Sequence, residues 1–129
     1  MALGILIGSI IPDLDMLWFL FVDHGMVHHH TYWTHRPALW LLGLCGAWMA
    51  TAPLIRGICC GALFHLVLDS IAGQINWGWP IWDFNVTLVT VPASQPHWIA
   101  SFLLHWTFAV ELGVLAAAIA VFFTKRRRP

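Results

Sequence analysis

Charged residues are scarce in this chain. Asp, Glu, Lys and Arg make up 9% of its 129 residues, whereas an average soluble domain carries about 25%. Six basic residues balance six acidic ones, and the cationic run is confined to Lys125–Arg128. A chain without a basic surface is not expected to bind nucleic acid. The low charged fraction also argues against a water-soluble globule.

Cysteine and tyrosine are rare as well. Cys45, Cys59 and Cys60 form no C-x-x-C motif and all fall in apolar stretches, so we interpret them as packing residues rather than disulfide partners or reactive thiols. A single Tyr stands beside nine Trp and eight Phe. Indole rings favour the headgroup level of a bilayer, which indicates a lipid bilayer as the partner of this chain.

Long apolar runs dominate what remains. Hydrophobic residues make up 60% of the chain, and the mean hydropathy is +0.77. A bilayer core about 30 Å thick needs about 20 mainly apolar residues per helix. Four runs approach that length: Leu3–Val22, Ala38–Ile55, Gly57–Ala72 and Ile99–Phe123. We therefore predict an all-α integral membrane protein with about four transmembrane helices, forming a single helical membrane domain over residues 1–129.

The residues between these runs predict the connections. Two polar, aromatic loops, residues 23–37 and 73–98, follow the first and third runs and are expected on one side of the membrane. A single Arg56 separates the second run from the third, which predicts a tight helical hairpin. Glycines at G-x-x-x-G spacing, Gly4 with Gly8 and Gly57 with Gly61, allow helix backbones to approach closely.

Basic residues predict the orientation of the chain. If all four runs span, Arg56 and the tail at residues 124–129 lie on one side and Arg36 lies alone on the other. Cytoplasmic flanks carry an excess of Lys and Arg. We therefore expect the basic tail to be cytoplasmic.

Two carboxylates interrupt the first apolar run, in the segment Pro12-Asp13-Leu14-Asp15. Inserting an Asp at the centre of a transmembrane helix costs about 2.5 to 3.5 kcal/mol of free energy. Intramembrane carboxylates therefore usually face a polar cavity or a cation. Pro12 favours a helix start or break here. Asp13 and Asp15 would then contact two cations, or converge on one if the segment is extended. The alternative is a loop at the membrane surface that only caps the following helix.

The loop after the first run concentrates five of the eight histidines of the chain: His24, His28, His29, His30 and His35. Such a density usually indicates metal binding. The alternative is an interfacial loop whose imidazoles titrate near neutral pH.

His65 and Asp69 stand four residues apart in the third run, so they share one face of a helix. The spacing suits two metal ligands, or one ligand and the carboxylate that orients it. In the last run, a helical wheel brings polar residues together as a stripe: His97, Ser101, His105 and Glu111. This stripe is either a structural hydrogen-bond network or a support for the metal site.

The order of these motifs is recognisable. The sequence runs through Ile11-Pro12-Asp13-Leu14-Asp15, His30 to Thr34-His35, His65-Leu66-Val67-Leu68-Asp69-Ser70 and Gly78-Trp79-Pro80. Over roughly residues 4–83 it resembles the YdjM-like family of inner-membrane, metal-dependent hydrolases, whose pattern runs P-D-x-D, H-R-x-x-T-H-S, H-L-x-x-D and a later proline-containing loop. Thr31 and Arg36 stand where that family has Arg and Ser, a change that would alter anion binding beside the site.

The resemblance implies a multi-pass protein of the inner (plasma) membrane. Members of that family tend to begin with an additional N-terminal helix that bears a His, whereas this chain starts almost at the P-D-x-D helix, so we expect that helix and a ligand on it to be missing here. The resemblance also implies metal ligands at Asp13, Asp15, His30, His35, His65 and Asp69, and catalytic roles for Asp13, Asp15, His65 and Asp69. More distantly, this use of helical Asp and His is similar to zinc-dependent phospholipases and nucleases, which suggests phosphoester chemistry by analogy.

Three carboxylates and three imidazoles would balance two divalent ions and one bridging hydroxide. Metal-bound water has a pKa near about 7 and so supplies a nucleophile at neutral pH. Mixed His and carboxylate ligands suit Zn²⁺, with Mn²⁺ or Fe²⁺ as alternatives, in one or two ions. We therefore predict a membrane-bound hydrolase acting on a phosphoester or another small or lipid-like substrate. A metal-ion or proton transporter, a haem-binding protein and a structural membrane subunit are the alternatives.

Overall fold

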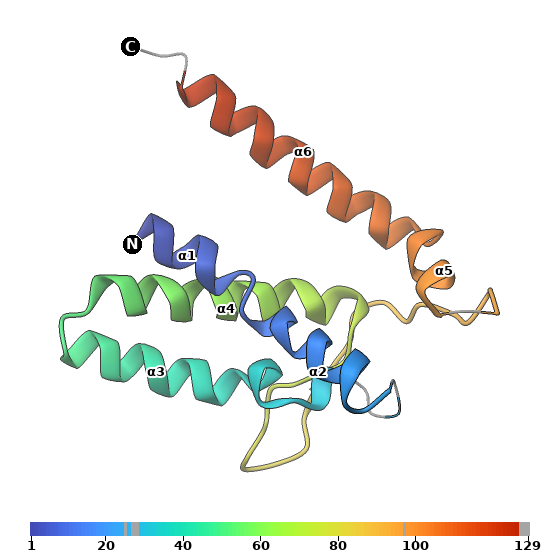
Figure 1. Cartoon of the computed structure of the whole chain (residues 1–129), viewed down its shortest axis with the longest axis horizontal. Coiled ribbons are helices and arrows are strands. Elements are labelled where there is room, and N and C mark those ends of the chain that lie inside the picture. The colour runs from blue at the N-terminus through green and yellow to red at the C-terminus, as the bar shows by residue number, and fades with distance from the viewer. Residues whose placement is uncertain (25, 27–28, 97, 127–129) are drawn as a thin grey trace. The chain divides into compact units, whose positions relative to one another are not determined.

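The computed structural model describes residues 1–24, 26, 29–96 and 98–126, and the chain divides into two units, Met1–Val89 and Thr90–Pro129. The second unit contains α5 (Trp98–Leu103) and α6 (Trp106–Arg126). The first unit contains α1 (Ala2–Gly8), η1 (Pro12–Leu14), α2 (Asp15–Phe21), η2 (His29–Thr31), η3 (Trp33–His35), α3 (Pro37–Met49), α4 (Pro53–Ala72), β1 (Ile75–Asn76) and β2 (Asn85–Val86), where η marks a short 3₁₀ turn (Figure 1). The predicted helical fold is confirmed, with one small antiparallel strand pair that the sequence did not indicate.

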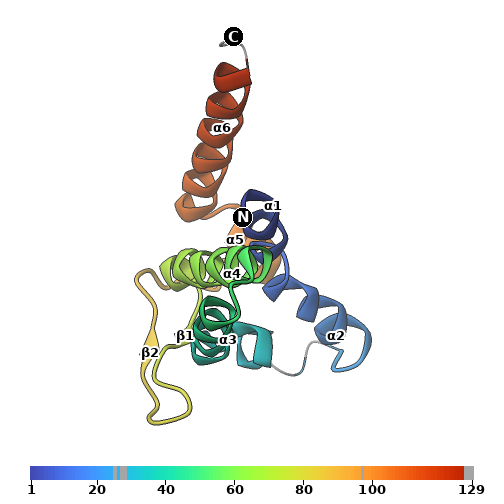
Figure 2. The same ribbon diagram turned by 90° about the vertical axis from the view of Figure 1, so that its left-hand side faces the viewer.

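Helix α4 is the centre of the first unit and lies between α1 and α3 (Figure 2). The predicted close approach of glycines is confirmed on its α1 side. A Cβ atom on Gly8 would lie 1.9 Å from the carbonyl oxygen of Ile58, and a Cβ atom on Gly61 would lie 2.2 Å from that of Ile5. Any side chain at these positions would push α1 and α4 apart.

The first apolar run breaks at Pro12, as predicted. Because Pro12 has no N–H, the α-helical ladder cannot continue through it. The next N–H group, on Asp13, donates to the carbonyl oxygen of Ile10 over 3.1 Å. This three-residue step replaces the four-residue step of an α-helix, and it leaves the carbonyl of Ser9 available to another donor.

Helices α3 and α4 form the predicted hairpin, but its turn lies earlier than expected. The turn occupies residues 50–52, because Pro53 takes the first position of α4, where a missing N–H costs nothing. Arg56, predicted to separate the helices, lies inside α4. Its guanidinium donates to the carbonyl oxygens of Ala47 (3.1 Å) and Trp48 (3.0 Å) at the end of α3, and so ties the hairpin together.

Among the described residues, two segments are long and apolar enough to cross a membrane, the broken first helix Ala2–Phe21 and α4. Large apolar side chains point outward from them: Leu6, Phe21 and Phe64 are 64%, 74% and 59% exposed. Contiguous apolar surface of this kind suits lipid rather than water. These two segments support membrane association.

Four spans, however, are not confirmed. Helix α3 has 13 residues, a length of about 20 Å, which is shorter than a bilayer core of about 30 Å. The predicted second span at Ala38–Ile55 is therefore wrong in its length. The fourth run, Ile99–Phe123, lies partly outside the described side chains and is not counted among the two segments.

The fourth run is interrupted. Helix α5 ends at Leu103 and α6 begins at Trp106, with His105 donating its N–H to the carbonyl of Phe102 in a tight turn. This break changes the angular register, so the continuous polar stripe predicted through His97, Ser101, His105 and Glu111 is wrong. His97 lies outside the described residues. Ser101 accepts the N–H of Gln95, and His105 pairs with Thr107.

Candidate metal site

The imidazole of His35 is fully buried inside the first unit. Local sequence places it there. Pro37 starts α3 directly after η3, and the indole N–H of Trp40 donates to the carbonyl of Thr34 over 2.7 Å. These contacts fix the turn that points His35 toward α4 and the break at Pro12.

Three ligand atoms surround one point beside His35. Asp69 Oδ2 lies 3.3 Å from His35 Nε2 and 3.0 Å from His65 Nε2, and Asp13 Oδ1 lies 3.5 Å from His65 Nε2. Four ligands at about 2.0 to 2.1 Å from a tetrahedral zinc ion lie about 3.3 Å from one another. These three separations bracket that value, and the ligand atoms of Asp13, His35 and His65 all lie within 4.8 Å of one another, so the cluster could hold a divalent ion.

Hydrogen bonds on the far side of each ring determine which nitrogen faces Asp69. His65 Nδ1 donates to the carbonyl oxygen of Ser9 over 2.9 Å, and His35 Nδ1 donates to Asp15 Oδ2 over 2.6 Å. Because these oxygens only accept, the proton lies on Nδ1 in each ring. In the neutral form, both Nε2 lone pairs therefore point at the carboxylate of Asp69. Metal-ligating histidines show this pattern, with the outer nitrogen held by a carboxylate or a carbonyl.

Such a cluster is unfavourable without a cation. Among the described residues, the buried atoms His65 Nε2 and Asp69 Oδ2 have no hydrogen-bond partner, and unpaired buried polar atoms usually indicate an ion or a water. Burial alone would lower the pKa of His35, but its hydrogen bond to Asp15 and the nearby carboxylates of Asp15 and Asp69 raise this pKa above its ordinary value. The site thus attracts a positive charge.

His30 approaches the cluster from η2. Its ring centroid lies 5.0 Å from that of His35, and ligand atoms of His30, His35 and Asp69 all lie within 4.8 Å of one another. The ring packs directly on Gly73, where a Cβ atom would lie 2.2 Å from His30 Cε1. The glycine that ends α4 therefore makes room for this imidazole.

The structure brings together all six residues that the sequence proposed as ligands: Asp13, Asp15, His30, His35, His65 and Asp69. His24 belongs to neither of the two ligand groups found among the described residues. His28 lies outside the described residues, as does the side chain of His29.

Sequence reasoning missed the groups that support the ligands. The hydroxyl of Thr34 donates to the same Asp15 oxygen that accepts from His35, and the carbonyl of Ser9 holds His65. The sequence did offer a signal for Thr34, because it is adjacent to His35 and its hydroxyl can reach the same carboxylate as the ring. The role of Ser9 had no signal, since any residue type carries a carbonyl.

Two cavities adjoin the cluster. One, of about 180 Å³, is lined by polar residues that include His30 and Arg36. The other, of about 540 Å³, is lined by Leu14, Asp15, Trp18, Tyr32, Trp33 and Thr34. The second cavity thus joins an apolar, aromatic wall to the carboxylate that holds His35.

Comparisons with protein-family models, with characterised proteins and with solved structures found no match to this chain.

Proposed function

We propose that this protein is a membrane-associated, metal-dependent hydrolase with one divalent ion at its centre. The observation that carries the proposal is that His35 Nε2, from η3, meets His65 Nε2 and Asp69 Oδ2, which share one face of α4. Two imidazoles and one carboxylate are a ligand set of catalytic zinc sites, in which a water takes the fourth position. The resemblance to the YdjM-like hydrolases is consistent with this proposal.

One ion is favoured over two by the position of His35. Both candidate ligand groups, one with Asp13 and His65 and one with His30 and Asp69, include His35. The Nδ1 atom of this ring is already bonded to Asp15, so His35 offers a single nitrogen to a metal. Two ions cannot both use it.

Asp15 and Ser9 act in this proposal as positioning residues rather than ligands. Asp15 fixes the ring of His35 and is itself held by Thr34. Carboxylates in this position also increase the basicity of the ligating nitrogen. We therefore assign to Asp15 the orientation of a ligand, in place of the direct ligation that the sequence suggested.

Asp13 differs from the other carboxylates of the cluster because its side chain is the most exposed. Its side chain is 57% exposed while its Oδ1 lies 3.5 Å from His65 Nε2. A carboxylate at this position can accept the proton of an attacking water. A bound Zn²⁺, Mn²⁺ or Fe²⁺ ion would supply the lowered pKa of that water and the charge that stabilises the leaving oxygen.

The apolar cavity beside Asp15 supports an amphipathic substrate. Trp18 and Trp33 in its wall are 58% and 72% exposed, and exposed indoles are usual where a protein meets the headgroup level of a bilayer. A phosphoester carrying an apolar chain fits a site placed between such a wall and a metal.

Metal analysis and a hydrolysis assay test the proposal. Protein purified in a neutral detergent is stripped with a chelator, reloaded with Zn²⁺ or Mn²⁺, and assayed for metal per chain and for cleavage of bis(p-nitrophenyl) phosphate. We expect one ion per chain, with cleavage lost on stripping and restored on reloading. His65→Ala should lose both, whereas the matched control His105→Ala, in the second unit, should retain both. Full metal content in His65→Ala would contradict the site.

The same protein in liposomes separates the hydrolase from the transporter. Ligands gathered at one point favour a resident ion, whereas a transport pathway distributes its ionisable residues across the bilayer. Zn²⁺ uptake that depends on His65, without phosphoester cleavage, would replace the proposed function by transport.

A further inference from the structure

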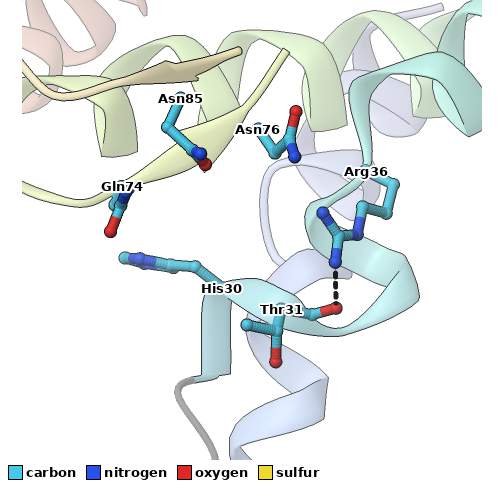
Figure 3. Close-up of a pocket in the computed structure, with 6 residues that line it drawn as sticks. All are labelled: His30, Thr31, Arg36, Gln74, Asn76 and Asn85. Atoms are coloured by element: carbon cyan, nitrogen blue, oxygen red, sulfur yellow. Dashed lines mark hydrogen bonds between the residues drawn. The ribbon is translucent and has the colours of Figure 1, made fainter. Parts of the chain in front are cut away.

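The polar cavity beside His30 has the composition of an oxyanion site. Its lining consists of His30, Thr31, Arg36, Gln74, Asn76 and Asn85. These residues come from η2, from the start of α3 and from the β1–β2 hairpin, and Figure 3 shows Arg36 and His30 on opposite sides of the enclosed space. No carboxylate lines this cavity among the described residues, although carboxylates dominate the cluster next to it.

Arg36 supplies the positive charge. One N–H of its guanidinium donates to the carbonyl oxygen of Thr31 over 2.9 Å, and the group lies 5.7 Å from the ring centroid of Trp79. These contacts fix the guanidinium but use only part of its five donors. Within the part of the chain that the structure describes, no carboxylate lies within ion-pair distance of Arg36. A held guanidinium with free donors is suited to phosphate-type oxyanions.

Amide side chains complete the lining. The Nδ2 groups of Asn76 and Asn85 both donate to Asp83 Oδ1 over 2.7 Å, so Asp83 fixes these amides. The side-chain oxygen of Asn76 accepts N–H groups of its own loop, including that of Trp79, which also holds the ring beside Arg36. Asp83 is itself exposed to solvent, where water screens its charge.

The cavity is adjacent to the metal cluster through one residue. His30 lines the cavity and also belongs to the ligand group with His35 and Asp69. At about 30 Å³ per water molecule, a cavity of about 180 Å³ has room for one phosphate-sized group and a few waters. An anion held by Arg36 would therefore lie next to the proposed ion.

We propose that this cavity binds the phosphoryl group of the substrate, with Arg36 as its specificity-determining residue. The inference rests on the proposed function, because it assigns a part of the substrate to the same site. A phosphomonoester, a phosphodiester headgroup of a lipid and free phosphate share this chemistry. A neutral ester or an amide would offer no negative charge to the remaining donors of Arg36.

Calorimetric titration in neutral detergent tests the inference. Inorganic phosphate is titrated into wild type, Arg36→Gln and Arg36→Lys, each stripped of metal and each reloaded with Zn²⁺. Because a hydrogen bond to a charged group contributes about 1.5 to 3 kcal/mol, Arg36→Gln should weaken phosphate binding roughly 10- to 100-fold with and without metal. Arg36→Lys keeps the charge but not the planar fork, and should lie in between. Gln74→Ala, at an exposed position, is a second variant that should weaken binding without threatening the fold.

Arg56→Gln is the matched control, since it removes an arginine that lies beside Ala47 and Trp48 at the other end of α3, about 17 Å along the helix from Arg36. Phosphate binding that is the same in wild type and Arg36→Gln would overturn the inference, and so would binding that requires Zn²⁺ and ignores Arg36. In the latter case the proposed function survives. Arg36-dependent binding in a protein that takes up no metal would support the cavity and contradict the proposed function.

A second arm identifies the source of the phosphoryl group. Dihexanoyl phosphatidic acid carries the same phosphomonoester on a lipid. Tighter binding of this lipid than of phosphate, with the same loss in Arg36→Gln, would support the cavity as a lipid headgroup site. Equal binding of the two would support it as a site for soluble phosphate compounds.

Discussion

His65 donates its Nδ1–H to the carbonyl oxygen of Ser9 over 2.9 Å, although the two residues are 56 positions apart. The bond depends on two local features. At the break after Pro12 the N–H of Asp13 donates to Ile10, so it leaves the Ser9 carbonyl available, and Gly8 and Gly61 bring α1 close enough to α4. Helix packing and ligand orientation are therefore coupled, and substitutions far from the cluster are expected to alter metal binding.

Asp69→Asn tests the carboxylate that both imidazoles face. The substitution keeps the volume and removes the charge. Loss of an outer support costs about 10- to 100-fold in metal affinity, and loss of a direct ligand should exceed that range. Competition with a fluorescent zinc chelator measures the affinity. Asp83→Asn, an exposed carboxylate in the β-hairpin loop, is the control and should keep wild-type affinity. Wild-type affinity in Asp69→Asn would remove this residue from the site.

Asp15→Asn separates a positioning role from a ligand role. Because Asp15 contacts His35 rather than the proposed ion, we expect metal affinity to fall about 10- to 100-fold while one ion per chain still binds at saturation. The visible spectrum of the Co²⁺-loaded protein should keep its four-coordinate bands with a shifted maximum. Thr34→Val, which removes the hydroxyl bonded to Asp15, should produce a smaller change in the same direction. Loss of the ion at saturation would make Asp15 a ligand.

The residues of the candidate cluster could be predicted from the sequence because carboxylates and imidazoles inside apolar runs are costly and conspicuous. Asp13, Asp15 and Asp69 each interrupt such a run, and the i, i+4 spacing of His65 and Asp69 follows from helical geometry. The G-x-x-x-G contacts were predictable for a similar reason, since small residues at that spacing serve close helix approach.

Other features could not be predicted because they depend on backbone atoms or on the path of the chain. The capping of α3 by Arg56 required knowledge of where the hairpin turns. The space that Gly73 leaves for His30 joins residues from segments with no periodic relation. The break between α5 and α6 contains no proline, so the sequence of this apolar run gives no sign that the helix is interrupted there.

Gly8→Ala tests the coupling between helix packing and the site. The added methyl group would overlap the backbone of Ile58, and overpacking of this kind costs about 1 to 3 kcal/mol. We expect a lower unfolding temperature in detergent and weaker zinc binding, because the Ser9 carbonyl moves away from His65. Gly46→Ala is the matched control, since nothing lies within 4 Å of its added Cβ. It should be neutral, or should stabilise α3 by about 0.5 to 1 kcal/mol. Equal behaviour of the two variants would contradict the close contact.

Gly73→Ala tests whether His30 takes part in metal binding. Gly73 has an extended backbone, with φ −111°, so alanine is allowed there by its conformation. The added methyl group instead meets the ring of His30 at 2.2 Å and the carbonyl oxygen of Asp69 at 2.9 Å. The flexible imidazole is the easier of the two to displace. If His30 is a ligand, Gly73→Ala should weaken zinc binding nearly as much as His30→Ala does.

A double-mutant cycle separates this effect from a change in Asp69. If the methyl group acts by displacing His30, adding Gly73→Ala to His30→Ala should cost little further affinity, so the two changes would not add. Additive losses would instead indicate that Gly73→Ala acts on Asp69 through its carbonyl. Wild-type zinc affinity in both single variants would exclude His30 from the site and leave the ion to His35, His65 and Asp69, with Asp13 beside them.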